Sequence, residues 1–199
     1  QTSTSERSGP SPASSAGSKG GKLPVAVIGS GPAGLFAALG LAESGVKCIV
    51  IERGQPVEER GRDIGAMLHR RILDQDSNIC YGEGGAGTWS DGKLTTRIGR
   101  NSGAVRYVLS QLVRFGAPEG ILVQGKPHLG TDRLVRILKS LRTYLEEHGV
   151  TFMFGTRVED ITVSAQGVTG LKYRAVHTRS AGSEHAGTLE ELRVQTIVM

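Results

Sequence analysis

The sequence predicts an α/β fold, in which a parallel β-sheet with covering helices is joined by a three-strand antiparallel meander. An apolar, β-branched run at 25–28 leads into a glycine-rich turn and then into an apolar helical stretch, 35–42. A second apolar run, 48–51, follows, and this order of strand, helix and strand is typical of parallel pairing. Three later strand-like segments have turn residues between them, as antiparallel strands do: 157–164, 168–177 and 189–194.

The composition is that of a globular protein with one sizeable core. The chain has 199 residues and a formal net charge of +5 at pH 7. Its basic residues are scattered and not interleaved with aromatic residues, which argues against a nucleic-acid-binding surface. No apolar run approaches the length of a membrane span. Two cysteines, Cys48 and Cys80, indicate a reducing compartment, and without metal-ligand spacing they are expected to be plain thiols.

The glycine-rich turn has the pattern G-x-G-x-x-G, with Gly29, Gly31 and Gly34 at its fixed positions. Gly29 permits a tight turn off the strand, Gly31 lets the backbone approach a pyrophosphate, and Gly34 lets the helix pack close to the sheet. Pro32 suits the first helical turn, where its missing N–H has no partner to lose. Free N–H groups and the positive dipole end at this helix start favour phosphate.

Glu52 ends the second apolar run, about 20 residues beyond the glycines, where an acid can accept hydrogen bonds from ribose hydroxyls. Strand, glycine turn, helix, strand and acid together make a Rossmann-type dinucleotide-binding unit. This context disfavours the alternative, a glycine-rich turn that binds nothing. The pattern recurs at 82–87, but no apolar strand precedes it and no helical period follows it, so we do not interpret it as a second such turn.

Residues 53–100 predict a helix followed by a long loop. A helix opens at 57–60, and its charged residues Glu58-Glu59-Arg60 are expected on a solvated face. Apolar residues continue at rough helical spacing: Ile64, Met67, Leu68 and Ile72. Residues 76–100 are glycine-rich and non-periodic, which lets a backbone lie close to a ligand.

Two amphipathic helices are predicted next, with a short extended piece at 121–123 between them. The first spans 102–115 and has Ser102 as its N-cap. The second begins near Thr131 or Asp132, either of which can cap it.

The last part of the chain is predicted to be strands. A buried strand at 151–154 is expected to be the next parallel one, and after the meander the run 196–199 is expected to return to the main sheet. The chain begins without Met and ends inside this apolar run. We therefore expect the N-terminal part of a longer protein, with the fold truncated before its last strand ends.

Residues 1–22 are rich in Ser, Gly, Thr, Pro and Ala and cannot bury enough apolar surface to offset the entropy of ordering. They are either a remnant of a plastid or mitochondrial transit peptide or an ordinary flexible tail. The corresponding locations are a plastid or another organelle, or otherwise the cytoplasm.

Two stretches carry a resemblance to a known family. Residues 29–35, GSGPAGL, with Glu52-Arg53, resemble the FAD-binding flavoproteins of the glutathione-reductase-like fold, in which a three-strand meander follows the third parallel strand. Residues 84–94, GGAGTWSDGKL, with PHLGTD at 127–132, resemble the uncharacterised FAD-dependent dehydrogenases of bacteria and plastids. The resemblance covers residues 23–199, which it implies to be an incomplete FAD/NAD(P)-binding domain.

The resemblance also implies a set of cofactor-binding residues. The N–H groups near Ala33 would donate to the pyrophosphate, Glu52 would bind the adenosine ribose, and Arg53 would lie near the adenine. The loop at 90–93 would approach the pyrophosphate or the flavin, and Val158 would offer backbone groups to the adenine. The full set is Gly29, Ser30, Gly31, Pro32, Ala33, Gly34, Glu52, Arg53, Ser90, Asp91, Gly92, Lys93 and Val158.

These observations favour an FAD-binding oxidoreductase, a dehydrogenase that uses bound FAD for hydride or electron transfer with a small-molecule substrate, with NAD(P)H as a candidate electron donor. One alternative is an NAD(P)-dependent dehydrogenase, although the charge of Glu52 opposes a 2′-phosphate and the glycine loop favours FAD. Another is a protein that holds FAD for a structural role.

Because FAD itself supplies the redox chemistry, the sequence need not contain a catalytic dyad, and no catalytic residue is inferred. His128 is either an acid/base or a side chain packed beside Pro127. Asp91 and Lys93 either bind phosphate or tune the flavin, or form an exposed salt bridge. Cys80 as a redox-active thiol is disfavoured, since no partner cysteine lies near it.

Overall fold

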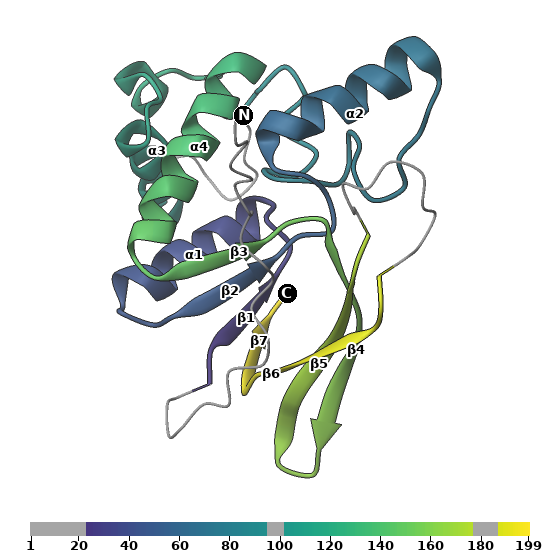
Figure 1. Ribbon diagram of the computed structural model, residues 1–199. Coiled ribbons are helices and arrows are strands. Elements are labelled where there is room, and N and C mark those ends of the chain that lie inside the picture. Colours follow the sequence, from purple (N-terminus) through teal and green to yellow (C-terminus); the bar gives the residue numbers. More distant parts are fainter. Residues whose placement is uncertain (1–22, 95–101, 177–186) are drawn as a thin grey trace, which may run out of the picture.

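A computed structural model describes residues 23–94, 102–176 and 187–199, and these form an α/β fold (Figure 1). The strands are β1 (Val25–Ile28), β2 (Cys48–Ile51), β3 (Val150–Met153), β4 (Thr156–Ser164), β5 (Gly167–Ala175), β6 (Glu190–Arg193) and β7 (Thr196–Val198). The helices are α1 (Pro32–Glu43), α2 (Val57–Arg70), α3 (Gly103–Arg114), the short 3₁₀ helix η1 (Glu119–Leu122) and α4 (Thr131–Glu147). The tail or transit remnant at 1–22 lies outside the described residues.

The main sheet is parallel and has the strand order β3-β2-β1-β7. Val25 of β1 is in register with Cys48 of β2 on one side and with Thr196 of β7 on the other. The predicted parallel strand and the predicted return of the last apolar run to this sheet are both confirmed. The carboxyl ends of β1 and β2 therefore lie side by side, which brings the glycine turn next to Glu52.

The two faces of this sheet are covered by different layers. Alternate strand residues such as Val27 and Val50 pack with α1, α3 and α4, whereas Ala26 and Ile51 pack on the meander. Side chains of successive strand residues point to opposite faces, so a strand that is covered on both faces is apolar throughout. This explains why the runs at 25–28 and 48–51 are continuous and do not alternate with polar residues.

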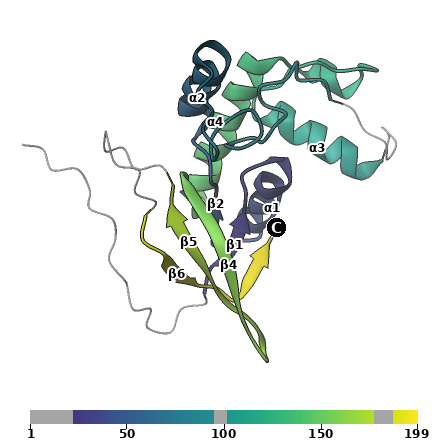
Figure 2. The ribbon, with the colours of Figure 1, turned by 90° about the vertical axis from the view of Figure 1, so that its right-hand side faces the viewer.

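The meander is a separate antiparallel sheet with the order β4-β5-β6, as predicted. Figure 2 shows it on the side of the main sheet away from α3 and α4. Leu171 of β5 and Val194 just after β6 are fully buried and pack against Ala26 and Ile51. β4 pairs with β5 along one edge only, which makes β4 an edge strand of this sheet.

Three details of the helices differ from the predictions or confirm them. Ser102 does cap α3, since its Oγ accepts the N–H of Val105 at 3.3 Å. The N-cap of α4 is Gly130, so Thr131 and Asp132 are its first helical residues and neither caps it. The predicted extended piece at 121–123 is wrong: Pro118, with φ −68°, starts η1, and Ile121 turns into the core.

Helix α2 buries the apolar stripe that the spacing of Ile64 indicates, but only over its N-terminal half, and the stripe includes Arg60. Its buried residues are Val57, Arg60 and Ile64, whereas Leu68 is 63% exposed. The expectation that Arg60 lies on a solvated face is therefore wrong. A charged residue occupies the buried stripe because the segment packed beneath it, 78–85, offers backbone carbonyl groups in place of apolar side chains.

Candidate functional site

The glycine turn joins β1 to α1 at the carboxyl edge of the sheet. Gly29 has φ +92°, and its N–H donates to the carbonyl of Ile51 at 2.8 Å, so the turn leaves β1 while still bonded to β2. Gly31 is the N-cap of α1, and Pro32 is the first residue of the helix. The first N–H groups of α1 lack intrahelical acceptors, as at any helix start, and they point toward the space in front of the turn.

Gly34 and Gly31 lack side chains for two different reasons. A Cβ on Gly34 would lie 2.0 Å from the carbonyl oxygen of Gly29, so only a glycine allows α1 to approach the strand this closely. A Cβ on Gly31 would meet nothing within 4 Å. The protein itself does not require a glycine at Gly31, so the open space there is available to something else.

Glu52 lies at the end of β2 and is 5% exposed. Its Oε2 accepts hydrogen bonds from the backbone N–H and the hydroxyl of Ser30, at 2.8 and 2.9 Å. Its Oε1 accepts from the N–H groups of Gly54 and Gly82, at 2.9 and 3.1 Å. An ionised carboxylate has about four acceptor positions, so this one is saturated by the protein.

The glycine-rich loop packs directly on the turn. The N–H of Gly84 donates to the carbonyl of Ser30 at 2.8 Å, and a Cβ on Gly85 would lie 3.3 Å from Cδ of Pro32. Residues 82–87 have turn and coil conformations with no strand before them, so they do not form a second Rossmann turn. Residues 82–87 instead pack against the glycine turn at Ser30 and Pro32.

Arg53 directly follows Glu52, and Val158 lies on β4. Arg53 forms an ion pair with Asp76, at 2.5 Å, and its guanidinium lies 4.2 Å from the ring centroid of Tyr81. Arg157 contacts the same carboxylate of Asp76 at 3.3 Å. Val158 is half-buried in the core beneath the meander, on the edge strand β4.

The segment 90–93 lies against the start of α4. Thr131 donates its hydroxyl to the carbonyl of Ser90 at 3.0 Å, and Lys93 forms an antiparallel bridge with His128. Asp91 and Lys93 form an exposed salt bridge of 2.6 Å, and the hydrogen bond from Lys93 lowers the pKa of Asp91. His128 itself is exposed beside the buried Pro127.

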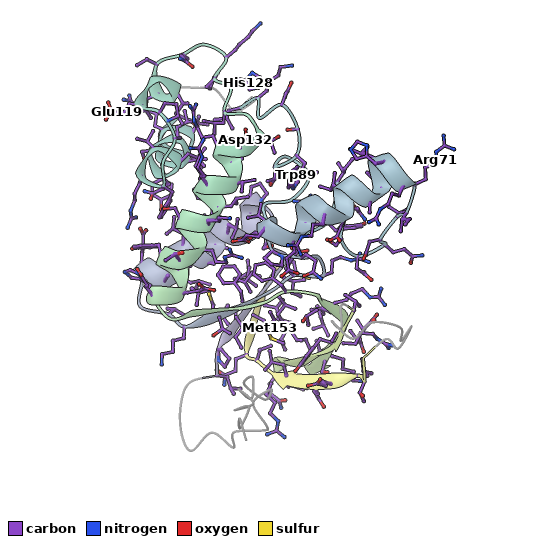
Figure 3. All side chains as sticks on the ribbon, turned by 45° about the horizontal axis from the view of Figure 1, so that its top comes forward. Arg71, Trp89, Glu119, His128, Asp132 and Met153 are labelled. Carbon is purple, nitrogen blue, oxygen red and sulfur yellow. The ribbon has the colours of Figure 1, made fainter. Side chains whose placement is uncertain are left out.

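Trp89 connects that segment to α2. A Cβ on Gly61 would lie 2.8 Å from the Trp89 ring, and both residues line a pocket of about 470 Å³ between α2 and α4. In Figure 3, Trp89 lies between these two helices, and His128 and Asp132 lie at the start of α4.

Sequence reasoning missed two buried charged residues, Arg60 and Glu83. Both are fully buried. Glu83 accepts the N–H of Val57 at the start of α2 at 2.7 Å and pairs with Arg142 at 3.2 Å. Burial raises the pKa of Glu83 despite these partners. Arg60 could have been found, because it shares the helical spacing of Val57 and Ile64 and therefore lies on their buried stripe.

Three further properties of the described residues concern thiols, metal ligands and membrane-spanning helices. Cys48 is buried and Cys80 exposed, both as free thiols, and burial raises the pKa of Cys48. Within the described ranges no three His, Cys, Asp or Glu side chains are arranged to hold a metal ion. In the same ranges, none of the helices combines the length and apolar character required to cross a membrane.

The fold is α/β, and its β1–α1–β2 unit lies within the stretch that matches a known family. Residues 22–75 match the family described as the FAD binding domain. An uncharacterized protein of Clostridium beijerinckii is 43% identical over 136 residues, which are 68% of this chain and 25% of that protein. A thiamine thiazole synthase of Methanococcus vannielii is 25% identical over 161 residues, 81% of this chain and 49% of that protein.

A solved structure supports the fold. The crystal structure of Thermovibrio ammonificans THI4 is 17% identical, with a TM-score of 0.52, and the match covers 88% of this chain and 56% of that one. The chain thus spans between a quarter and about half of the lengths of the two curated relatives.

Proposed function

We propose that the chain is the FAD-binding part of an FAD-dependent oxidoreductase. The observation that carries this proposal is the pair of features at the carboxyl edge of the sheet: the open space at Gly31 in front of the α1 N-terminus, and the buried carboxylate of Glu52 beside it. The match of residues 22–75 to the FAD binding domain supports it. When bound, FAD would supply the electron-transfer chemistry.

The residues present fit such a cofactor. The pyrophosphate would lie at Gly31, with the N–H groups of Ala33 and Gly34 as its donors, and the helix dipole would favour its charge. Gly29 and Gly34 would hold the turn, and Ser30 and Pro32 would fix the helix start. Val158, on an edge strand, would offer backbone groups to the adenine.

Glu52 can bind a ribose hydroxyl only if one of its present hydrogen bonds is broken. All four of its acceptor positions are in use, so a ribose hydroxyl reaches the carboxylate only in exchange for a present donor. Among those donors, the Ser30 hydroxyl can rotate away, whereas the other three are fixed backbone N–H groups. We infer that Ser30 gives up its side-chain hydrogen bond when FAD binds.

The remaining assignments rest on the resemblance. Arg53 would lie beside the adenine, and Ser90, Asp91, Gly92 and Lys93 would approach the pyrophosphate or the flavin. Residues 23–199 would be an incomplete FAD/NAD(P)-binding domain within a protein of the glutathione-reductase-like class, with NAD(P)H as the electron donor and a small molecule as the substrate. A plastid or other organellar location would rest on the composition of residues 1–22.

The test uses the full-length protein. We expect it to purify yellow and to release FAD on denaturation, as identified by chromatography of the supernatant. Release of FMN, or a colourless protein that takes up no FAD, would contradict the proposal. Anaerobic addition of NADH or NADPH then tests the electron donor: bleaching of the flavin absorbance supports the oxidoreductase with NAD(P)H as donor, whereas a flavin that dithionite reduces and NAD(P)H does not would contradict NAD(P)H as the donor.

A further inference from the structure

The side chain of Arg60, on α2, donates five hydrogen bonds to backbone carbonyl groups. Its guanidinium is fully buried, and every one of its acceptors is a backbone carbonyl of the segment 78–85. The bonds run from Nε to Asn78 at 2.9 Å, from Nη2 to Ile79 at 2.7 Å, and from Nη1 to Gly82 at 3.3 Å, Glu83 at 2.8 Å and Gly85 at 2.8 Å.

The segment needs these donors because it has no regular secondary structure. A buried backbone carbonyl without a donor destabilises the folded state, and a segment of turns cannot pair all its carbonyl groups internally. The planar guanidinium supplies five N–H donors in one rigid group. The absence of a side chain at Gly82 makes room for Arg60, since a Cβ there would lie 2.5 Å from Cδ of Arg60.

The opposite side of the same segment contacts the proposed cofactor site. The N–H of Gly82 donates to Oε1 of Glu52 at 3.1 Å, and the N–H of Gly84 donates to the carbonyl of Ser30 at 2.8 Å. Arg60 therefore holds the carbonyl groups of a segment whose N–H groups hold Glu52 and the glycine turn. Arg60 and Glu52 also attract each other electrostatically: burial lowers the pKa of Arg60, and this attraction raises it against that effect.

We propose that Arg60 is a positioning residue for cofactor binding, acting through Gly82 and Gly84 on Glu52 and the Ser30 backbone. This inference rests on the proposed function, because it assigns Arg60 to the same site. Lysine cannot replace it: an ammonium has three donors on a single nitrogen and cannot reach carbonyl groups spread along 78–85.

The first experiment measures the FAD affinity of the full-length protein by fluorescence titration. Arg60→Lys should weaken binding by about tenfold or more, because several charge-assisted hydrogen bonds to the segment are lost. Arg62→Lys, at an exposed position on the same helix, is the matched control and should leave the affinity unchanged. Unchanged affinity in Arg60→Lys would overturn the inference while leaving the proposed function standing. An unsubstituted protein that binds no FAD would overturn the proposed function, and the inference with it.

A double-mutant cycle separates positioning from general support of the fold. Arg60→Lys and Glu52→Gln should have non-additive effects on FAD affinity, since the first acts through the second. Additive effects would show that Arg60 only stabilises the fold, and would overturn the inference.

A measurement on the unsubstituted protein covers the case in which Arg60→Lys does not fold. Hydrogen exchange at the amides of Gly82 and Gly84 should slow when FAD binds, because their acceptors belong to the proposed cofactor site. Unchanged exchange at both amides would overturn the coupling that the inference requires.

Discussion

Ser30 and Glu52 are joined by two hydrogen bonds that end on the same carboxylate oxygen, one from the backbone N–H of Ser30 and one from its hydroxyl. The glycine turn after β1 is thereby tied to the end of β2. The other oxygen of Glu52 ties in Gly54 and Gly82. The carboxylate that we propose to bind the ribose therefore also holds together the three segments that form the site.

Glu52→Ala should lower the stability of the protein even without cofactor. The substitution leaves four donors without their acceptor, and each hydrogen bond to a charged group contributes about 1.5–3 kcal/mol, so the loss should be at least that of one such bond. Ser30→Ala is the milder comparison, since it removes one donor and leaves the carboxylate with its three backbone N–H partners. Urea unfolding of both variants measures the difference. An unfolding midpoint of Glu52→Ala equal to that of the unsubstituted protein would show that the four bonds contribute nothing net.

Gly31→Val should abolish FAD binding and leave the fold intact. The Cβ of residue 31 meets nothing within 4 Å in the protein, and Gly31 has φ −70°, which valine adopts readily. The valine would instead fill the space assigned to the pyrophosphate. The measurement pairs an FAD titration with circular dichroism. Full FAD occupancy in this variant would place the phosphate elsewhere.

Gly34→Ala and Gly40→Ala, both in α1, should have opposite effects. The new Cβ at residue 34 would lie 2.0 Å from the Gly29 carbonyl oxygen, so the helix must move away from the strand, and both stability and FAD binding should fall. At residue 40 the Cβ meets nothing within 4 Å, and alanine should stabilise the helix by about 0.5–1 kcal/mol. Thermal unfolding reports both. Equal shifts in the same direction would contradict the close packing at Gly34.

Glu83→Gln should change how stability depends on pH. Burial raises the pKa of Glu83 above its ordinary value of 4.5, so the folded protein retains a proton that the unfolded chain has released. Stability from this group is therefore present at low pH and is lost as the pH rises through and above that value. The free energy of unfolding of Glu83→Gln, relative to the unsubstituted protein, should rise over the same window. Glu147→Gln, exposed on α4, is the control. A pH-independent difference for Glu83→Gln would contradict the raised pKa.

The parts of the fold predicted from the sequence are those in which local pattern and tertiary structure agree. The continuous apolar run at 25–28, the glycine spacing and Glu52 each have a local signature, and the β1–α1–β2 unit follows from them. Ser102 was identified as a cap because its side chain acts on its own helix. The piece at 121–123 was misjudged because three apolar residues do not distinguish a strand from one helical turn, and the preceding Pro118 favours the turn.

The site was less predictable than the fold, because its buried charged residues are stabilised by hydrogen bonds from segments distant in the sequence. Arg60 was predicted to lie on a solvated face because it follows Glu58 and Glu59 in a run of charged residues. Its five carbonyl partners lie in the segment 78–85, about 20 residues further along the chain, and no local pattern indicates that pairing. The saturation of Glu52 was invisible for a related reason, since the N–H of Gly82 reaches it only through the folded loop.

The pairing of β1 with β7 also has a consequence for synthesis of the chain. β1 leaves the ribosome well before β7, the strand that pairs with it on the side opposite β2. Until β7 emerges, the backbone groups on that side of β1 have no sheet partner, and an apolar edge of this kind can pair with another chain. During the interval between the synthesis of β3 and that of residue 196, this open edge of β1 therefore exposes nascent chains to pairing with one another, and we expect a chaperone that binds apolar strands to raise the yield by acting then.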